Sequence, residues 1–234
     1  FGSFNFSLLL KNTIGISLYT LLIGFPIPII FALLLNYLRL KHLKKTLQMV
    51  SYAPYFISTV VICGMIAIFM DKNTGIFNQI IVALGGEAQD FLSKPQYFKS
   101  IYVWSGVWQG MGYSSIIYIS ALSGVDPALH EAAIMDGATK WQQFKKITFP
   151  LLMASINNVV VLSIIGGLKV FDIVVATTGG GPGYATEVFN TMIYNSYSYQ
   201  KYGEATAGTT LLAGMILIIT LCTYRTIAKN EVEL

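Results

Sequence analysis

Five long stretches without a charged residue constrain the fold of this chain more than any other feature. They cover residues 14–38, 47–70, 100–125, 151–168 and 205–224. Each can cross a lipid bilayer, because roughly 20 helical residues span a hydrocarbon core about 30 Å thick. An outer-membrane β-barrel is disfavoured, since its strands alternate polar and apolar residues over about ten positions. The stretches therefore predict an all-α membrane protein with five transmembrane helices.

The composition agrees with this prediction. Apolar residues make up 54% of the 234 residues, and charged residues only 11%. A soluble helical protein would carry charged faces opposite its apolar stripes, and these stretches have no such faces. We therefore expect residues 1–234 to form a single transmembrane domain.

The basic residues between the stretches indicate which ends of the helices face the cytoplasm. One set of ends carries nine of them: Arg39, Lys41, Lys44, Lys45, Lys140, Lys145, Lys146, Arg225 and Lys229. The opposite ends carry six: Lys11, Lys72, Lys94, Lys99, Lys169 and Lys201. Cytoplasmic loops of membrane proteins hold an excess of lysine and arginine, so the side with nine is expected to be cytoplasmic. The net charge of +4 then needs no nucleic-acid partner.

Two other functional classes find little support in the residues. A secondary transporter driven by protons or sodium would place carboxylates inside its spans, and the five stretches contain none. A membrane-embedded enzyme would need a convergent acid, base or metal set. The only cluster is His130, Glu131 and Asp136, and the neighbours His130 and Glu131 point to different faces of a helix.

No disulfide framework or metal site is predicted. Cys63 and Cys222 lie within apolar stretches and are expected to be buried free thiols. The chain has two histidines, which stand alone in cytoplasmic segments. A haem or a redox metal is therefore not expected, and no cofactor is assigned to this chain.

Two outer segments join the stretches, over residues 71–99 and 169–203. In the first, the apolar run 76–84 lies between turn signals and is either a short surface helix or a packed loop. The second contains the glycine-rich run 177–183. A phosphate-binding loop would need a following lysine with serine or threonine, on the side of the nucleotide. The run lacks both features and is interpreted as a flexible turn that contacts an external partner.

The cytoplasmic segment over residues 126–150 is the most informative part of the sequence. Asp126 and Pro127 are typical of a helix start, with aspartate as the N-cap and proline at the first helical position. The helix should end just before Gly137, which can adopt the left-handed backbone that turns the chain into a second helical run. Its small, apolar surface suits docking in a groove of a partner. Pro150 is expected to end this unit at the membrane boundary, where the next span begins.

One motif within this segment has a specific spacing. Glu131-Ala132-Ala133 is followed after three residues by Gly137, and after nine more by Ile147-Thr148-Phe149-Pro150. This pattern resembles the EAA loop of inner-membrane permeases in bacterial binding-protein-dependent ABC importers. Phe149 stands where the pattern prefers leucine, which changes only an apolar shape.

Further segments resemble sugar permeases, particularly those that serve polysaccharide-derived oligosaccharides. They are Asn12-Thr13, Phe25-Pro26-Ile27-Pro28, Tyr52 to Ser58, Gly124 to Pro127, and Phe171-Asp172 followed by Thr178 to Gly183. The resemblance covers nearly the whole chain. Members of the family usually have six helices, the first preceding a five-helix core, so the chain is expected to begin partway through the natural protein.

The resemblance implies a transport subunit of the bacterial cytoplasmic (inner) membrane that does not itself hydrolyse ATP. Such a permease pairs with a second, related permease and with two cytoplasmic ATPase subunits, which bind ATP and Mg²⁺. A solute-binding protein delivers the oligosaccharide at the outer face. The residues that the resemblance implies for coupling to the ATPase are Glu131, Ala132, Ala133, Asp136, Gly137, Ile147 and Pro150.

Sugar contacts are expected from aromatic and amide side chains inside the spans, since polar groups at membrane depth usually face the interior of the bundle. The candidates are Trp104, Trp108, Gln109, Tyr113, Asn157 and Asn158. Other roles stay open for them: amides also bond between helices, and tryptophan or tyrosine near the end of a span often anchors it at the interface.

Overall fold

The computed structural model describes residues 5–38, 40–177, 179 and 185–232 of the chain. Within these ranges every regular element is a helix. In chain order they are α1 (Asn5–Tyr19), η1 (Thr20–Gly24), α2 (Pro26–Tyr37), α3 (Lys41–Tyr52), η2 (Ala53–Phe56), α4 (Thr59–Phe69), α5 (Ile76–Ala83), α6 (Pro95–Ser123), α7 (Pro127–Met135), α8 (Lys140–Gln143), η3 (Phe144–Thr148), α9 (Phe149–Leu168), α10 (Asp172–Thr177), α11 (Phe189–Ser198) and α12 (Tyr202–Val232). Most of the glycine-rich run 177–183 lies outside the described residues.

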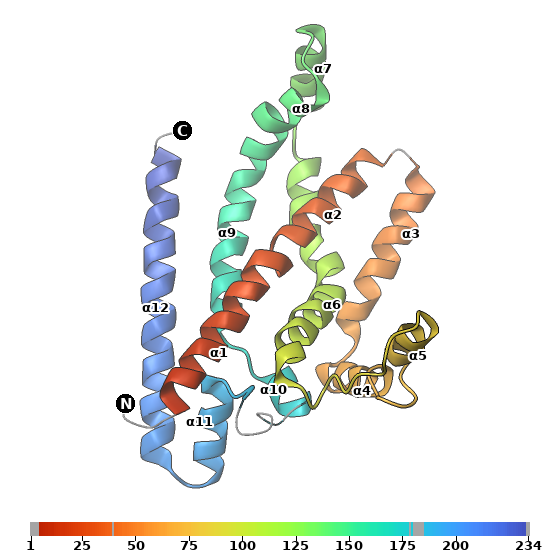
Figure 1. Cartoon of the computed structure of the whole chain (residues 1–234). Coiled ribbons are helices and arrows are strands. Elements are labelled where there is room, and N and C mark those ends of the chain that lie inside the picture. Colours follow the sequence, from red (N-terminus) through yellow and green to blue (C-terminus); the bar gives the residue numbers. More distant parts are fainter. Residues whose placement is uncertain (1–4, 39, 178, 180–184, 233–234) are drawn as a thin grey trace.

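Among the described residues, three helical runs are long and apolar enough to cross a membrane by length and composition. They are Phe6–Tyr37, Lys140–Thr177 and Tyr202–Ala228, and the bent pair Lys41–Phe56 and Thr59–Phe69 makes a fourth if it counts as one span. The remaining predicted stretch lies on α6, which has 29 residues but is not among these runs. It packs in the middle of the bundle against α2, α3 and α9 (Figure 1), so neighbouring helices cover much of it.

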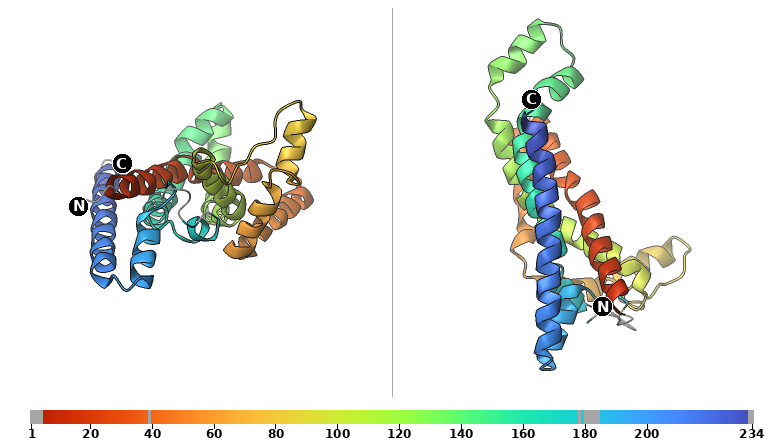
Figure 2. Two further views of the ribbon diagram at one scale, coloured as in Figure 1. Left: turned by 60° about the horizontal axis from the view of Figure 1, so that its bottom comes forward. Right: turned by 90° about the vertical axis from the view of Figure 1, so that its left-hand side faces the viewer.

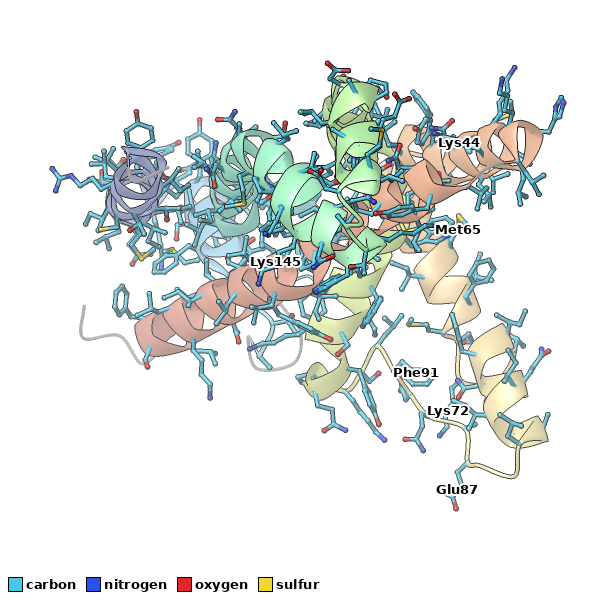
Figure 3. The ribbon with its side chains drawn as sticks, turned by 90° about the horizontal axis from the view of Figure 1, so that it is seen from above. Lys44, Met65, Lys72, Glu87, Phe91 and Lys145 are labelled. Atoms are coloured by element: carbon cyan, nitrogen blue, oxygen red, sulfur yellow. The ribbon has the colours of Figure 1, made fainter. Side chains whose placement is uncertain are left out.

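The two ends of the bundle are clearly different. At one end α7 and α8 project beyond the other helices, and α2 and α12 have their C-terminal ends on the same side of the bundle (Figures 1 and 2). We call this the cytoplasmic end, because the basic residues of α3, α8 and η3 lie here; Figure 3 labels Lys44 and Lys145. The opposite, outer end holds α4, α5, α10 and α11 with the start of α1.

Two π-helical turns carry the long helices through prolines. η1 ends shortly before Pro26, and η3 ends shortly before Pro150. Proline has no N–H to donate, and its ring crowds the carbonyl of the preceding turn. A π turn widens the helix and shifts its hydrogen bonds by one residue, as in the bond from Phe149 N to Phe144 O. The helix therefore runs on from α8 through Pro150 into α9, and the membrane boundary expected at Pro150 stays a prediction.

The second predicted stretch, residues 47–70, is not one straight helix. The run formed by α3 and η2 lies along the bundle, whereas α4 turns away from it by 99° and lies across the outer end (Figure 1). Pro54 is the second residue of η2. Because it has no N–H to donate, the backbone hydrogen bonds of α3 cannot continue through it. Ser58 then starts α4 afresh, because its hydroxyl accepts a hydrogen bond from Val61 N at 3.4 Å.

The outer segment over residues 71–99 folds around one buried amide. Asn78, in α5, donates to Asp71 O and to Gln89 O, both at 2.9 Å, and its Oδ1 accepts from Gln89 N at 2.8 Å. Asn78 is buried, so these bonds replace its contacts with water. The run 76–84 is thus largely helical rather than an irregular loop, and Asn78 ties the helix to both of its flanks.

The two cysteines are free thiols, as predicted, but they differ in burial. Cys63 is buried in α4, whereas Cys222 is exposed on α12. The prediction that Cys222 is buried is therefore wrong. Within the described chain α12 packs chiefly against α9 and α11 at one flank of the bundle, which leaves much of its surface uncovered (Figure 2).

Candidate functional site

The projection at the cytoplasmic end begins with a helix whose two ends are fixed by their chemistry. Asp126 caps α7 by accepting a hydrogen bond from a backbone N–H of the first turn at 2.9 Å, and Pro127 occupies that turn. At the other end Gly137 has a φ of +74°. This left-handed residue lets Ala138 N donate to Ala133 O at 2.9 Å, which closes the last turn. Both ends of the helix match the sequence prediction.

A second cap starts α8. Thr139 and Gln142 form a capping box, in which Gln142 N donates to Thr139 Oγ1 at 3.3 Å and Thr139 N donates to Gln142 Oε1 at 2.7 Å. From there the helix continues through η3 into α9, which packs against α1, α6 and α12. A continuous helix therefore joins the projection to the membrane bundle.

Polar contacts hold α7 and α8 together. His130 Nδ1 lies 3.4 Å from Gln143 Oε1, and Gln143 Nε2 donates to Ala138 O at 3.1 Å. The first contact joins α7 to α8, and the second joins α8 to the turn between them. Within the run from α8 into η3, Trp141 stacks on Phe144 with ring centroids 5.4 Å apart. His130 thus has a structural role in the α7–α8 pair.

The surface of the projection is exposed and partly apolar. None of the residues of α7 is buried. Ile134 is 62% exposed, Met135 88% and Trp141 69%. Soluble surfaces rarely carry large apolar side chains grouped at the tip of a protruding element, and such a group marks a surface for a protein partner.

The structure divides the seven residues that the EAA resemblance implies for coupling. Five of them lie on α7 and its C-terminal turn, at the projecting tip: Glu131, Ala132, Ala133, Asp136 and Gly137. Ile147 and Pro150 lie in the helical stem formed by η3 and the start of α9. The set therefore comprises a tip and a stem rather than one cluster.

The residues predicted for the substrate path lie in three separate places. Trp104 and Trp108, on α6, line a pocket of about 400 Å³ together with side chains of α4 and α5, including Met65 (Figure 3). Ser105 supplies the only hydroxyl of that lining, and apart from the indole N–H groups of the two tryptophans the rest of it is apolar. A sugar site needs several placed polar groups, and this pocket has few.

Gln109 and Tyr113 instead face the bend between η2 and α4. Gln109 Nε2 donates to Ile57 O at 3.0 Å, which satisfies a backbone carbonyl at the break in the helix. Tyr113 stacks on Tyr55, with ring centroids 3.8 Å apart and ring planes 3° apart. Both rings remain partly exposed and present a flat aromatic face. Tyr55 lies in the segment Tyr52 to Ser58 that resembles sugar permeases, but the sequence alone does not predict this stacking.

Asn157 and Asn158 lie on a different helix, α9. Asn157 is half-buried and Asn158 is exposed. Successive residues of an α-helix are turned by about 100° from each other, so the two amides do not act at one place.

The Asn12-Thr13 pair has a structural role that its sequence did not reveal. Asn12 Nδ2 donates to Ala185 O at 2.9 Å and to Glu187 O at 3.1 Å, while Thr13 Oγ1 accepts from Phe189 N at 3.2 Å. These residues are buried. The pair therefore joins the outer part of the first span to the segment that leads into α11. A buried Asn-Thr pair at the start of a span is a signal for such a contact, but it does not identify the partner.

One protein family matches the chain over nearly its whole length. Residues 12–229 match the model described as "Binding-protein-dependent transport system inner membrane component". The chain belongs to this family. It is thus a multi-pass membrane component of a binding-protein-dependent transporter, and not an enzyme.

Named relatives of this permease include transport proteins for sugars. It is 34% identical over 226 residues to the polygalacturonan/rhamnogalacturonan transport system permease protein YteP of Bacillus subtilis, an alignment that covers 96% of this chain and 70% of that protein. It is 31% identical over 191 residues to the trehalose/maltose transport system permease protein MalF of Thermococcus litoralis, covering 82% of this chain and 64% of that protein. The permease chain thus spans about two thirds of the length of these relatives.

Solved structures also resemble the permease. A bacterial ABC transporter involved in the import of the acidic polysaccharide alginate matches with a TM-score of 0.92 and 32% identity, covering 97% of this chain and 80% of that chain. A bacterial alginate ABC transporter in complex with an alginate pentasaccharide-bound periplasmic protein matches with a TM-score of 0.90 and 33% identity. An amino acid ABC transporter with a TM-score of 0.58 and 16% identity shares the fold alone.

Proposed function

We propose that this permease is one of two related membrane subunits of an ABC importer that brings a polysaccharide-derived oligosaccharide across a bacterial inner membrane. A solute-binding protein would deliver the sugar at the outer end, and two ATPase subunits would bind ATP and Mg²⁺ at the cytoplasmic end. The observation that carries this proposal is the match to the alginate importer over 97% of the chain at 32% identity. The name of the polygalacturonan/rhamnogalacturonan relative supports the same class of substrate.

The projection formed by α7 and α8 is the proposed site of coupling to the ATPase. Its exposed apolar side chains would dock in a cleft of that subunit, while Glu131 and Asp136 are exposed and available to a cationic partner. The continuous helix from α8 through η3 into α9 would carry a displacement of the tip into the bundle. ATP and the loaded binding protein would then act by favouring one of two orientations of the bundle, as population shift requires.

The stacked pair Tyr55 and Tyr113 is the surface we favour for contact with the sugar. Its flat, partly exposed rings suit the apolar face of a pyranose, whereas the pocket beside Trp104 and Trp108 is almost wholly apolar. Gln109 has a positioning role in this proposal, because its hydrogen bond to Ile57 O holds the bend that follows Tyr55.

Reconstitution of the complete importer in proteoliposomes tests the proposal. Labelled oligogalacturonides and alginate oligosaccharides would be compared with neutral malto-oligosaccharides, each with and without ATP inside and the binding protein outside. Uptake of at least one oligosaccharide should require both ATP and the loaded binding protein. Transport by the permease alone, or transport driven by an ion gradient without ATP, would instead support a secondary carrier and would remove the proposal.

A further inference from the structure

Two lysines of the outer end, Lys11 and Lys99, lie close together, and we call them the lysine pair. Lys99 begins on α6 and reaches across to α1, where its Nζ lies 2.9 Å from the position that a Cβ on Gly15 would occupy. Lys11 lies one turn of α1 before Gly15, on the same face of that helix. The glycine therefore leaves the space in which the ammonium group of Lys99 approaches that of Lys11.

The lysine pair has no anion to balance it. Lys99 ends the outer segment over residues 71–99, and burial, together with the smaller effect of the positive charge of Lys11, lowers the pKa of Lys99. In the part of the chain that the structure describes, the one ion pair joins Lys201 to Glu204, and neither lysine of the pair donates a hydrogen bond. Two neighbouring ammonium groups repel each other, so a ligand of net negative charge would stabilise both.

Exposed apolar side chains continue from the lysine pair along the first span. Ile14, Leu18 and Leu22 follow Lys11 at intervals of three and four residues, which places them on the same face of the helix. All three are exposed, whereas Ile16, on the opposite face, is buried. We call these three side chains the apolar stripe. The bundle covers one face of α1 and leaves the face with the stripe free.

The order of these groups follows the layers of an outer leaflet. α1 begins at the outer end of the bundle and runs toward the cytoplasmic end (Figure 1), so Lys11 lies outermost and Leu22 deepest. At about 1.5 Å per residue, the two residues are about 16 Å apart along the helix axis. Half of a hydrocarbon core about 30 Å thick is about 15 Å. An acyl chain that follows the stripe therefore passes through most of one leaflet.

We propose that the lysine pair binds the phosphodiester of an anionic phospholipid of the outer leaflet, such as phosphatidylglycerol, while an acyl chain lies along the apolar stripe. The net negative charge of this lipid complements two lysines. Phosphatidylethanolamine and phosphatidylcholine would instead hold a cation beside two like charges. An acidic oligosaccharide fits this face less well, because its rings need polar partners and the stripe offers none.

Native mass spectrometry of the complete importer tests this lipid site. Importer taken from nanodiscs of phosphatidylglycerol, phosphatidylethanolamine or phosphatidylcholine would be compared for the phospholipid that it retains. Phosphatidylglycerol should be retained best. Lys99→Gln should weaken its retention about tenfold, the effect of losing one charge-assisted hydrogen bond, and Lys99→Arg should preserve it. Inorganic phosphate should not displace the lipid, because it has no acyl chain.

Gly15→Leu tests the placement of the lysine pair without changing its charge. The new side chain would take the position of the Lys99 ammonium group and push it away from Lys11. Because this group ends a flexible side chain, the helix should keep its fold while retention falls about as far as in Lys99→Gln. The matched control is Lys72→Gln, which removes an exposed lysine from the connection between α4 and α5 (Figure 3) and should leave retention unchanged.

Five results would overturn the proposal. Equal retention of the three phospholipids, or unchanged retention of phosphatidylglycerol in Lys99→Gln, would remove the anion site. An equal loss in Lys72→Gln would show an effect of overall charge alone. Displacement of the lipid by inorganic phosphate or by trigalacturonate would assign the lysine pair to a soluble anion. Cross-linking of a Leu18→Cys variant to the second permease would make the apolar stripe a subunit interface. The measurement needs no transport, so its result is independent of the proposed function.

Discussion

Substitution of Gly137 tests whether the projection acts as a rigid lever. Its φ of +74° lies in the left-handed region, which residues with a side chain adopt at a cost. A Cβ placed on Gly137 meets no atom within 4 Å, so a substitution there clashes with nothing and its cost is conformational alone. The cost is smallest for asparagine, about 1 kcal/mol for alanine, and about 2 to 3 kcal/mol for a β-branched valine.

These costs predict the order of activities in a series of variants. The population of the closed turn, relative to an open one, should fall about fivefold for Gly137→Ala and about thirtyfold or more for Gly137→Val. We therefore expect Gly137→Asn to retain most of the coupled uptake, Gly137→Ala to reduce it, and Gly137→Val to abolish it. The permease should remain in the membrane in each case, because the turn lies outside the bundle.

The assay is oligosaccharide uptake by proteoliposomes together with ATP hydrolysis stimulated by the loaded binding protein. The amount of assembled importer would be measured in the same preparations. Undiminished uptake with Gly137→Val would refute the hypothesis that a rigid projection couples ATP hydrolysis to transport. Equal losses with Gly137→Asn and Gly137→Val would refute the conformational argument, since those two residues differ mainly in their tolerance of a left-handed backbone.

Three further predictions concern the packing of the bundle and of its outer end. Gly112→Leu should lower the free energy of unfolding by on the order of 3 kcal/mol, seen as a lower melting temperature of the importer, because a Cβ on Gly112 would lie 2.2 Å from Ser51 O. Gly106→Ala should leave the melting temperature unchanged, because a Cβ on Gly106 meets nothing within 4 Å. Asn78→Leu removes three hydrogen bonds from a buried site and should destabilise the fold of residues 71–99 by about 2 to 4 kcal/mol. Hydrogen exchange in these residues should then become faster, and exchange at the wild-type rate would contradict this. Burial raises the pKa of Glu187 above its ordinary value. The protonated carboxyl therefore stabilises the folded permease at low pH, and this stability should be lost as the pH rises through the raised pKa. Glu187→Gln should remove this pH dependence in thermal melts taken across pH.

Features that depend on near neighbours could be predicted from the sequence. The five uncharged stretches all fall on helices of the bundle, and α7 begins at the Asp126 cap and ends at the left-handed Gly137. Each of these depends on chemistry within a few residues. Pro150 shows the limit of such rules, because a π turn in the preceding residues lets the helix continue where proline alone indicates an end.

Features that depend on distant segments could not be predicted. Asn12 bonds to backbone 173 residues further along the chain, and no local pattern identifies that partner. Residue type and membrane depth predict the sugar candidates, and neither property fixes the direction in which a side chain points. The structure places Trp108 beside α4 and α5, Gln109 at the bend, and Asn158 on α9. Residues of a suitable type and depth therefore lie in three different environments.

The bend between η2 and α4 gives the polar side chains in the middle of α6 a structural role. A broken helix is tolerated at membrane depth only where protein or water satisfies its backbone groups. Here Gln109 of α6 donates to Ile57 O, and Ser58 caps the new helix. Tyr113 lies one turn beyond Gln109 and stacks on Tyr55, just before the bend. The same polar part of α6 therefore stabilises the break and leaves an aromatic face uncovered beside it, so the bend and the proposed sugar contact follow from a single packing arrangement.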